Sequence, residues 1–236
     1  METDRIERIE QRFEYRYKMK KFVNVLISAA IFISGVLSLI YIWNYDQDGL
    51  LTFRWLTVDG TIFTSAIAFF YVIISILEIL HYTELTNRYV YFMRLASAVA
   101  ESLILVVVLL SQLPFSNQHL HIFRFDMFQM HVLIPVLTVA SFILNDSPIG
   151  KLNFLQKLHG TWFITLYAVV IITLIKTGIL LPDKIPYFFL DVTSLPFISF
   201  LGYVVFVYAL GITLSHFLSC WNRKLSWIWF RGITDT

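Results

Sequence analysis

Two residues of this sequence could form a nucleophile and its base, although they stand far apart in the chain. Thr57 begins one apolar stretch, and His131 stands four residues before Pro135 in another. A threonine hydroxyl attacks a carbonyl carbon only when a neighbouring base removes its proton, and an imidazole can do so near neutral pH. A carboxylate that orients the imidazole would complete such a site, and three acidic residues could supply it: Asp59, Asp126 and Glu101.

The composition places these residues in membrane-spanning helices. The chain has 236 residues, of which 58% are hydrophobic and 14% charged, against roughly 45–50% and about 25% in soluble domains. The excess lies in stretches of about 20 residues, the length of a helix that crosses a hydrocarbon layer. This pattern excludes a nucleic-acid-binding protein and a soluble enzyme. We expect an all-α, polytopic membrane protein with six transmembrane helices in one bundle, at about residues 22–43, 56–80, 90–113, 127–144, 159–181 and 196–218.

The distribution of lysine and arginine predicts that both termini are cytoplasmic. With six spans, the N-terminus, the second and fourth loops and the C-terminus share one side, and fourteen of the 18 basic residues lie there. Positively charged residues stay on the cytoplasmic side. The basic segment 1–21 is either a short helix on the cytoplasmic leaflet or a solvated extension, and residues 219–236 form a short cytoplasmic tail. We expect the protein in the plasma membrane.

Polar residues inside the spans need a reason, because a charge at the bilayer centre costs about 2.5–3.5 kcal/mol on insertion scales. Most of them lie toward the outer ends of the spans, and the inner half of the bundle carries few. We therefore expect a polar pocket with apolar walls that opens toward the outer leaflet and takes an amphiphilic ligand. The residues that could support it are Asp59, Glu101, Asp126, Lys176 and Asp191.

Several of these residues also have a structural interpretation. Thr61 and Ser65 follow Thr57 at steps of four, which is typical of a small-residue stripe for close helix packing. Lys176 either extends its ammonium to the outer surface or pairs with an intramembrane carboxylate. Glu101 lies deeper and either carries a proton or donates a structural hydrogen bond. Pro135 predicts an irregular helix near His131, because proline cannot donate to the carbonyl four residues earlier.

Three short motifs occur in order along the chain: Trp55-Leu56-Thr57, His131-Val132-Leu133-Ile134-Pro135 and Pro186-Tyr187-Phe188-Phe189-Leu190-Asp191-Val192. With them the chain resembles the androgen-induced protein family and its bacterial six-pass relatives over nearly all six spans. The resemblance implies a threonine hydrolase that cleaves fatty-acid esters of hydroxy fatty acids. Its nucleophile and base would fall on Thr57 and His131.

The leading hypothesis is an intramembrane hydrolase of lipid or fatty-acyl esters that needs no cofactor or metal. One alternative is a non-enzymatic membrane protein for lipid binding or assembly. Another is a haem-b electron carrier, because His81, His159 and His216 lie near the cytoplasmic ends of three spans. An ion transporter would use Glu101 and Asp59, but no chain of acidic groups crosses the bilayer in the sequence.

Overall fold

Six helices of the chain are long and apolar enough to cross a membrane, as the sequence predicts. The computed structural model describes residues 2–45, 49–81, 85–109 and 123–230, and the regular elements in these ranges are all helical. The candidate spans are Ile6–Tyr45, Leu56–His81, Arg88–Val107, Phe125–Asn145, Phe154–Lys176 and Phe197–Trp229. The chain is therefore an all-α, multi-pass membrane protein.

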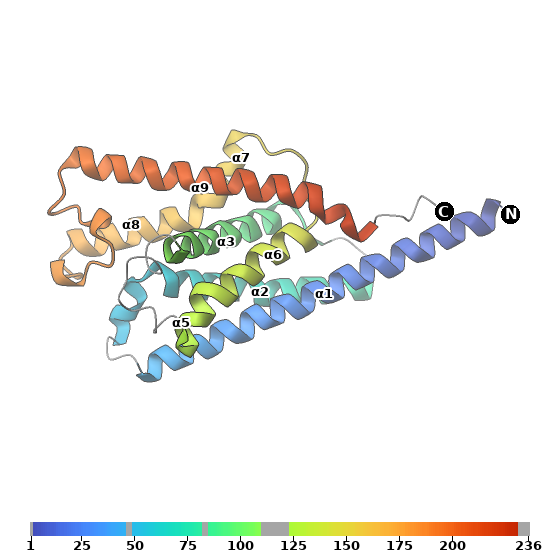
Figure 1. The fold of residues 1–236 in the computed structure, drawn as a ribbon, viewed down its shortest axis with the longest axis horizontal. Helices are drawn as coiled ribbons and strands as arrows, with labels where there is room; N and C mark the ends of the chain where they lie inside the picture. Colours follow the sequence, from blue (N-terminus) through green and yellow to red (C-terminus); the bar gives the residue numbers. More distant parts are fainter. Residues whose placement is uncertain (1, 46–48, 82–84, 110–122, 231–236) are drawn as a thin grey trace.

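The helices run side by side in one elongated bundle (Figure 1). The α-helices are α1 (Glu2–Tyr45), α2 (Leu56–His81), α3 (Arg88–Val107), α5 (Phe125–Phe128), α6 (Ile134–Asn145), α7 (Phe154–Leu158), α8 (Trp162–Lys176) and α9 (Phe197–Leu225). The shorter elements are η1 (Gly49–Arg54), the π-helical turn η4 (Gln129–Leu133), η5 (His159–Thr161), η6 (Pro182–Lys184), η7 (Phe188–Leu190) and η8 (Ser226–Phe230). We call the end where α2 begins the Thr57 end, and the end where α3 begins the Arg94 end.

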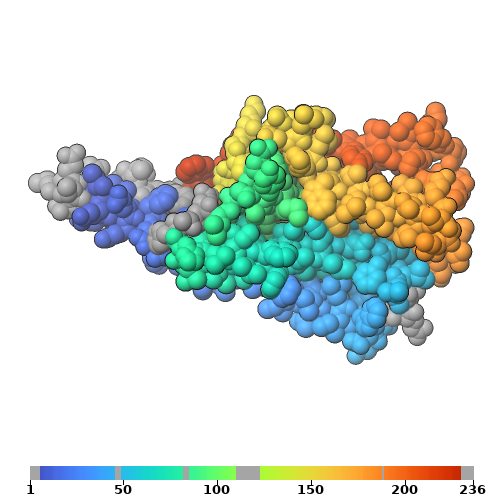
Figure 2. Space-filling view, turned by 180° about the vertical axis from the view of Figure 1, so that it is seen from behind, coloured from blue at the N-terminus to red at the C-terminus, as the bar shows by residue number. Residues whose placement is uncertain are grey.

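Some boundaries differ from the predicted ones. The basic N-terminal segment is continuous with the first span, because α1 runs through both as one 44-residue helix that extends beyond the other helices (Figures 1 and 2). Helix α8 ends at Lys176, earlier than predicted, since Gly178 takes a φ of 74° that a right-handed helix cannot continue through. Helix α9 takes in the start of the predicted tail. Residues 110–113 and 231–236 lie outside the described ranges.

The interior of the bundle carries many polar side chains. The buried positions of α1 and α2 alternate at steps of three and four, which is the spacing of a helix–helix seam. Many large apolar side chains face outward instead, including Phe206 on α9, which is 64% exposed. Lipid does not drive helices together by the hydrophobic effect, so small and polar residues gather at their contacts. The seam consists of Lys21, Asn24, Ser28, Ile31, Gly35 and Ser38 on α1 and Thr61, Thr64, Ala68, Tyr71, Ser75 and Glu78 on α2.

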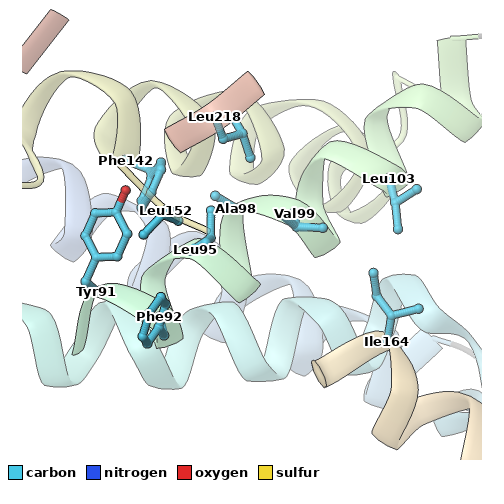
Figure 3. Close-up of a cluster of buried hydrophobic side chains, with 10 residues drawn as sticks. All are labelled: Tyr91, Phe92, Leu95, Ala98, Val99, Leu103, Phe142, Leu152, Ile164 and Leu218. Carbon is cyan, nitrogen blue, oxygen red and sulfur yellow. The ribbon is translucent and has the colours of Figure 1, made fainter. Parts of the chain in front are cut away.

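Apolar clusters fill the remaining contacts. The largest joins α3, α6, α8 and α9 around Leu95, Phe142, Ile164 and Leu218 (Figure 3). A smaller cluster of Ile31, Ala68 and Ile134, all fully buried, closes the contact between α1, α2 and α6 near the middle of the spans. A third joins Ile42, Val58 and Met130 at the Thr57 end.

The closest approach of α1 and α2 depends on Gly35. A Cβ at this position would lie 1.9 Å from Ser65 Oγ, 3.1 Å from Ser65 Cβ and 3.4 Å from Thr61 Cγ2. The packing role predicted for Thr61 and Ser65 is therefore confirmed. Their hydroxyls have no hydrogen-bond partner among the described residues, so back-bonding to the helix does not accompany it.

We expect Gly35→Ala to lower the free energy of unfolding by about 1–3 kcal/mol, because the added methyl group overpacks the α1–α2 contact. Thermal unfolding in detergent measures the effect. Gly202→Ala on α9 is the matched control, since a Cβ there meets nothing within 4 Å, and it should be neutral or slightly stabilising because alanine favours helix. Equal effects of the two substitutions would contradict this account of the contact.

Candidate functional site

Thr57 lies in the first turn of α2, next to a set of aromatic side chains. The amides of Val58 and Asp59 donate to the Trp55 carbonyl at 3.0 and 3.1 Å, so the helix begins immediately before Thr57. The first N–H groups of a helix have no partner within it, and they carry the positive end of the helix dipole. The half-buried hydroxyl of Thr57 therefore stands where a developing negative charge would be favoured.

Two tyrosines from the other half of the chain surround this turn. The Tyr167 hydroxyl donates to the Arg54 carbonyl at 2.5 Å. Tyr187 packs edge-on against the Trp55 ring, with 5.8 Å between centroids, and its hydroxyl lies beside the Leu56 amide and the Thr57 hydroxyl. Burial raises the pKa of Tyr187 to about 12, although both of these neighbours favour the phenolate. Tyr187 therefore keeps its proton at neutral pH and can donate a hydrogen bond.

His131 lies in the π-helical turn η4, which directly precedes Pro135. The amide of Ile134 bonds back to the Gln129 carbonyl, five residues earlier. The predicted irregularity is therefore present, and it is a widened turn that accommodates the missing amide and the ring of the proline. The imidazole is 8% exposed, and its Nδ1 lies 3.0 Å from the Met127 carbonyl oxygen. A carbonyl only accepts, so Nδ1 carries the proton and Nε2 carries the lone pair.

Thr57 and His131 belong to neighbouring parts of the Thr57 end. Their sequence neighbours, Val58 and Met130, lie in one apolar cluster with Ile42 of α1. Among the described residues no hydrogen bond joins the Thr57 hydroxyl to the imidazole. The structure therefore brings the two residues to the same region of the bundle without joining them.

Of the three carboxylates considered for His131, Asp126 is the one whose charge reaches the imidazole. It is fully buried, and Arg124 holds it through two bonds of 2.6 Å. Asp59 is half-buried in the first turn of α2, where its charge acts on Tyr167 and Tyr187 instead. Glu101 lies on α3 and faces α2, with one carboxyl oxygen 3.9 Å from where a Cβ of Gly60 would be.

Lys176 and Asp191 do not join this group. Lys176 is exposed in the last turn of α8 and makes no ion pair with any described residue, in keeping with the predicted extension to the surface. Asp191 lies in the loop between α8 and α9, where it accepts hydrogen bonds from the amides and hydroxyls of Thr193 and Ser194. It stabilises that turn.

The prediction that the inner half of the bundle carries few polar groups is wrong. At the Arg94 end, Lys21 and Glu78 form an ion pair of 2.6 Å in which both side chains are 0% exposed. Arg94 Nε donates to Asp146 at 3.0 Å, and both side chains are 1% exposed. All four residues lie near the ends of the predicted spans, where charged residues are common. From the sequence pattern alone they are interpreted as loop residues or as part of the positive charge that marks the cytoplasmic side.

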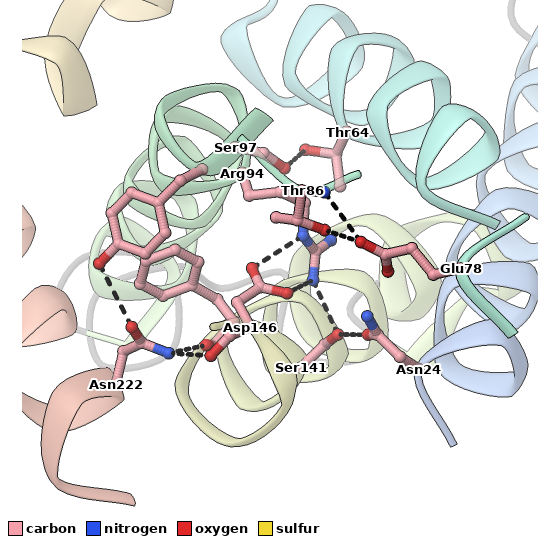
Figure 4. A network of polar contacts seen from close by, with 11 residues as sticks. Asn24, Thr64, Glu78, Thr86, Arg94, Ser97, Ser141, Asp146 and Asn222 are labelled. Carbon is pink, nitrogen blue, oxygen red and sulfur yellow. Dashed lines mark hydrogen bonds and ion pairs between the residues drawn. The ribbon is translucent and has the colours of Figure 1, made fainter. Parts of the chain in front are cut away.

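Hydrogen bonds extend these ion pairs across the bundle (Figure 4). Arg94 also donates to Ser141 at 2.8 Å, Ser141 donates to Asn24 at 3.0 Å, and the guanidinium lies 4.5 Å above the Tyr71 ring. Asn222 of α9 donates to the carbonyls of Phe142 and Asp146, each at 2.8 Å. We call this set, with Lys21 and Glu78, the Arg94 network. It links α1, α2, α3, α6 and α9.

The spacing of polar residues could have revealed the network. Lys21, Asn24 and Ser28 recur at steps of three and four, as do Tyr71, Ser75 and Glu78, so each set occupies one helix face. A polar stripe on one face of an apolar helix indicates an interior position. Tyr187 has no such signal, because its position depends on how the loop before α9 folds back onto α2.

Two of the three histidines considered for haem have recorded neighbours in the bundle. The His159 ring stacks on Phe92 with 4.5 Å between centroids, and His216 lies beside Cys220 on its own helix. His81 ends α2. None of these contacts favours a haem ligand over a packing residue. No protein-family model, no curated protein and no solved structure matches the chain.

We expect Glu78→Gln to destabilise the protein by about 3–5 kcal/mol, because it leaves the Lys21 ammonium buried without a counter-charge. The measurement is thermal or denaturant unfolding in detergent. Glu14→Gln is the control, because its partner Lys18 and Glu14 itself are 43% and 46% exposed, and such pairs contribute about 0–1 kcal/mol. A loss for Glu78→Gln no larger than that for Glu14→Gln would contradict the role given to the buried pair.

We expect Asp191→Ala to speed amide hydrogen exchange at Thr193 and Ser194, because the carboxylate accepts from both amides at 3.0 and 3.2 Å. The Ser194 and Thr193 hydroxyls lower the pKa of Asp191 from 3.8 to about 2. A group with a lowered pKa stabilises the folded state at every pH above its pKa in the unfolded chain. Protection of these amides from exchange should therefore be complete above pH 3.8 and lost as the pH falls toward 2. Asp183→Ala, at a carboxylate that is 69% exposed, should leave exchange unchanged. Equal exchange in both variants would refute this.

Proposed function

We propose that this protein hydrolyses lipid esters within the membrane, with Thr57 as the nucleophile and His131 as the base. The Thr57 oxygen forms a bond to the acyl carbon while its proton passes to Nε2 of His131. The imidazolium then returns that proton to the departing alcohol. Water, deprotonated by the same nitrogen, attacks the acyl carbon, and the bond to the Thr57 oxygen breaks as that oxygen takes the proton back from the imidazolium and the fatty acid leaves.

The observation that carries the proposal is the contact between Nδ1 of His131 and the Met127 carbonyl, 3.0 Å long. It fixes the tautomer in which Nε2 accepts a proton, as a general base requires. His131 stands in the π-helical turn that Pro135 imposes on this span. Such turns occur frequently at functional sites.

The surroundings of Thr57 support the same reaction. The oxyanion of the tetrahedral intermediate would lie at the N-terminal end of α2, where the helix dipole favours negative charge. Tyr187 adds a hydroxyl that lies beside Thr57 and stays protonated, since burial raises its pKa to about 12. These groups stabilise the intermediate more than the neutral ester, which is the requirement for catalysis.

The lining of this region favours an amphiphilic substrate. Apolar side chains of Tyr167, Ile171 and Ile175 on α8 pack with Leu56 on one side of Thr57, and the Ile42–Val58–Met130 cluster lies on the other. An acyl chain gains free energy from such walls, at about 0.8 kcal/mol per buried CH₂ group. In keeping with the distribution of basic residues, we place the Arg94 end and both termini in the cytoplasm and the protein in the plasma membrane.

A second candidate function is lipid binding without catalysis. It is favoured by the missing hydrogen bond between Thr57 and His131 among the described residues. Catalytic hydrogen bonds are often long in enzymes without substrate and tighten when it binds. Covalent labelling distinguishes the two candidates, since a binding protein has no activated hydroxyl.

We expect Thr57→Ala and His131→Ala each to abolish fatty-acyl ester hydrolysis and fluorophosphonate labelling, with expression and unfolding temperature retained. Thr61→Val is the matched control. This substitution removes a hydroxyl that lies one turn farther along the same helix face and has no hydrogen-bond partner among the described residues. The variant should keep full activity. Hydrolysis at the wild-type rate in Thr57→Ala or His131→Ala would disprove the proposal, and lipid co-purification without labelling would favour the binding protein.

A further inference from the structure

Glu101 is a buried carboxyl group without a counter-charge. It lies on α3 and is 0% exposed, and both carboxyl oxygens lack a hydrogen-bond partner among the described residues. The other fully buried carboxylates are paired: Glu78 with Lys21 at 2.6 Å, Asp146 with Arg94 at 3.0 Å and Asp126 with Arg124 at 2.6 Å. Glu101 is therefore exceptional among the buried acids of the described chain.

Within the described ranges, the elements packed against α3 bring no cation to Glu101. On α2, Gly60 and Thr64 lie against it, and Asp59 precedes Gly60. On η4 the titratable group is His131, which bonds to Met127. Two of the remaining cationic groups on neighbouring elements have other contacts, since Arg94 pairs with Asp146 and His159 of η5 stacks on Phe92. The others lie toward the ends of their helices: Lys176 at the end of α8, and His216, Arg223 and Lys224 in the second half of α9.

An ionised carboxylate in this position would have no water and no counter-charge among the described residues to replace its hydration, and the hydroxyl of Thr64 is its polar neighbour. Removing such a charge from water costs far more than keeping a proton on it at neutral pH. A neutral carboxylic acid carries no charge to be solvated, and it has one O–H group that can donate a hydrogen bond.

We propose that Glu101 is a proton-binding site in the interior of the bundle, occupied at neutral pH. The ligand of this site is a proton, and the site is independent of the ester hydrolysis proposed above. It would make the charge inside the bundle depend on the pH on the side from which the proton enters.

The Thr64–Ser97 pair connects this site with the Arg94 end. Ser97 donates to the Thr64 hydroxyl at 3.0 Å (Figure 4), so the proton of Thr64 remains free to be donated to the adjacent Glu101. Ser97 lies between Arg94 and Glu101 on one face of α3, at steps of three and four. These two hydroxyls extend polar contacts from Glu101 toward the Arg94 end.

Infrared spectroscopy of the protein in lipid vesicles tests the proposal directly. At neutral pH we expect the carbonyl stretch of a protonated carboxylic acid, lost in Glu101→Gln and retained in Asp59→Asn and in Asp183→Asn, whose carboxylate is 69% exposed. Glu101→Gln replaces a neutral acid by a neutral amide of the same shape, so its unfolding temperature should equal that of the wild type. A stretch that persists in Glu101→Gln, or that disappears only in Asp59→Asn, would overturn the assignment, as would a spectrum without it.

Labelling with dicyclohexylcarbodiimide provides a second measurement. The acid proton passes to a carbodiimide nitrogen while a carboxyl oxygen bonds to the central carbon, and the adduct rearranges to an N-acylurea with no leaving group. Mass spectrometry should find the label on the peptide containing Glu101, decreasing as the pH rises, and not on the peptides containing Glu78 or Asp146. Protection by sodium ions at constant pH would overturn the proposal in favour of a metal-cation site.

Discussion

Lipid offers no partner to a charged side chain, and this constraint governs how the six helices are arranged. Two complete ion pairs, Lys21–Glu78 and Arg94–Asp146, lie inside the bundle with almost no exposure. Each pair joins two helices, and Asn222 and Ser141 tie further helices to the same set. Because every member must find its partner, the rotation and height of α1, α2, α3 and α6 relative to one another are fixed at the Arg94 end.

The Thr57 end is held in a different way. Its contacts are apolar clusters, the Arg124–Asp126 ion pair and hydrogen bonds from tyrosine hydroxyls to backbone groups, such as Tyr167 to Arg54. The apolar cluster of Ile31, Ala68 and Ile134 stands between the two ends. The fully buried ion pairs serve the fold at the Arg94 end, whereas the Nε2 lone pair of His131 has no partner among the described residues. Leaving a polar group unpaired inside the bundle costs free energy. A polar group that stays unpaired there is therefore a candidate for a functional role.

The sequence predicts the six spans because length and hydropathy alone determine whether a helix can cross a bilayer. It also predicts the irregular turn at His131 and the packing of Thr61 and Ser65, which depend on local chemistry. The Arg94 network was not predicted, because Arg94 and Lys21 lie near helix ends, where a basic residue usually signals topology. The carboxylate whose charge reaches His131 is Asp126, and its position depends on how α5 packs. Helix α5 is only four residues long, so its sequence shows no periodicity that could predict this packing.

Thr57 and His131 share a feature that does not depend on any single contact. Thr57 lies where the hydrogen-bond ladder of α2 begins, and His131 lies where Pro135 forces the ladder into a π-helical turn. Incomplete backbone hydrogen bonding is tolerated at membrane depth only where protein surrounds it or where it lines a cavity. Two such places on neighbouring elements at one end of the bundle are costly for a protein that only needs to span a membrane. The cost is understandable if the backbone and side-chain groups left free there meet a polar substrate group, such as an ester, delivered by an apolar chain.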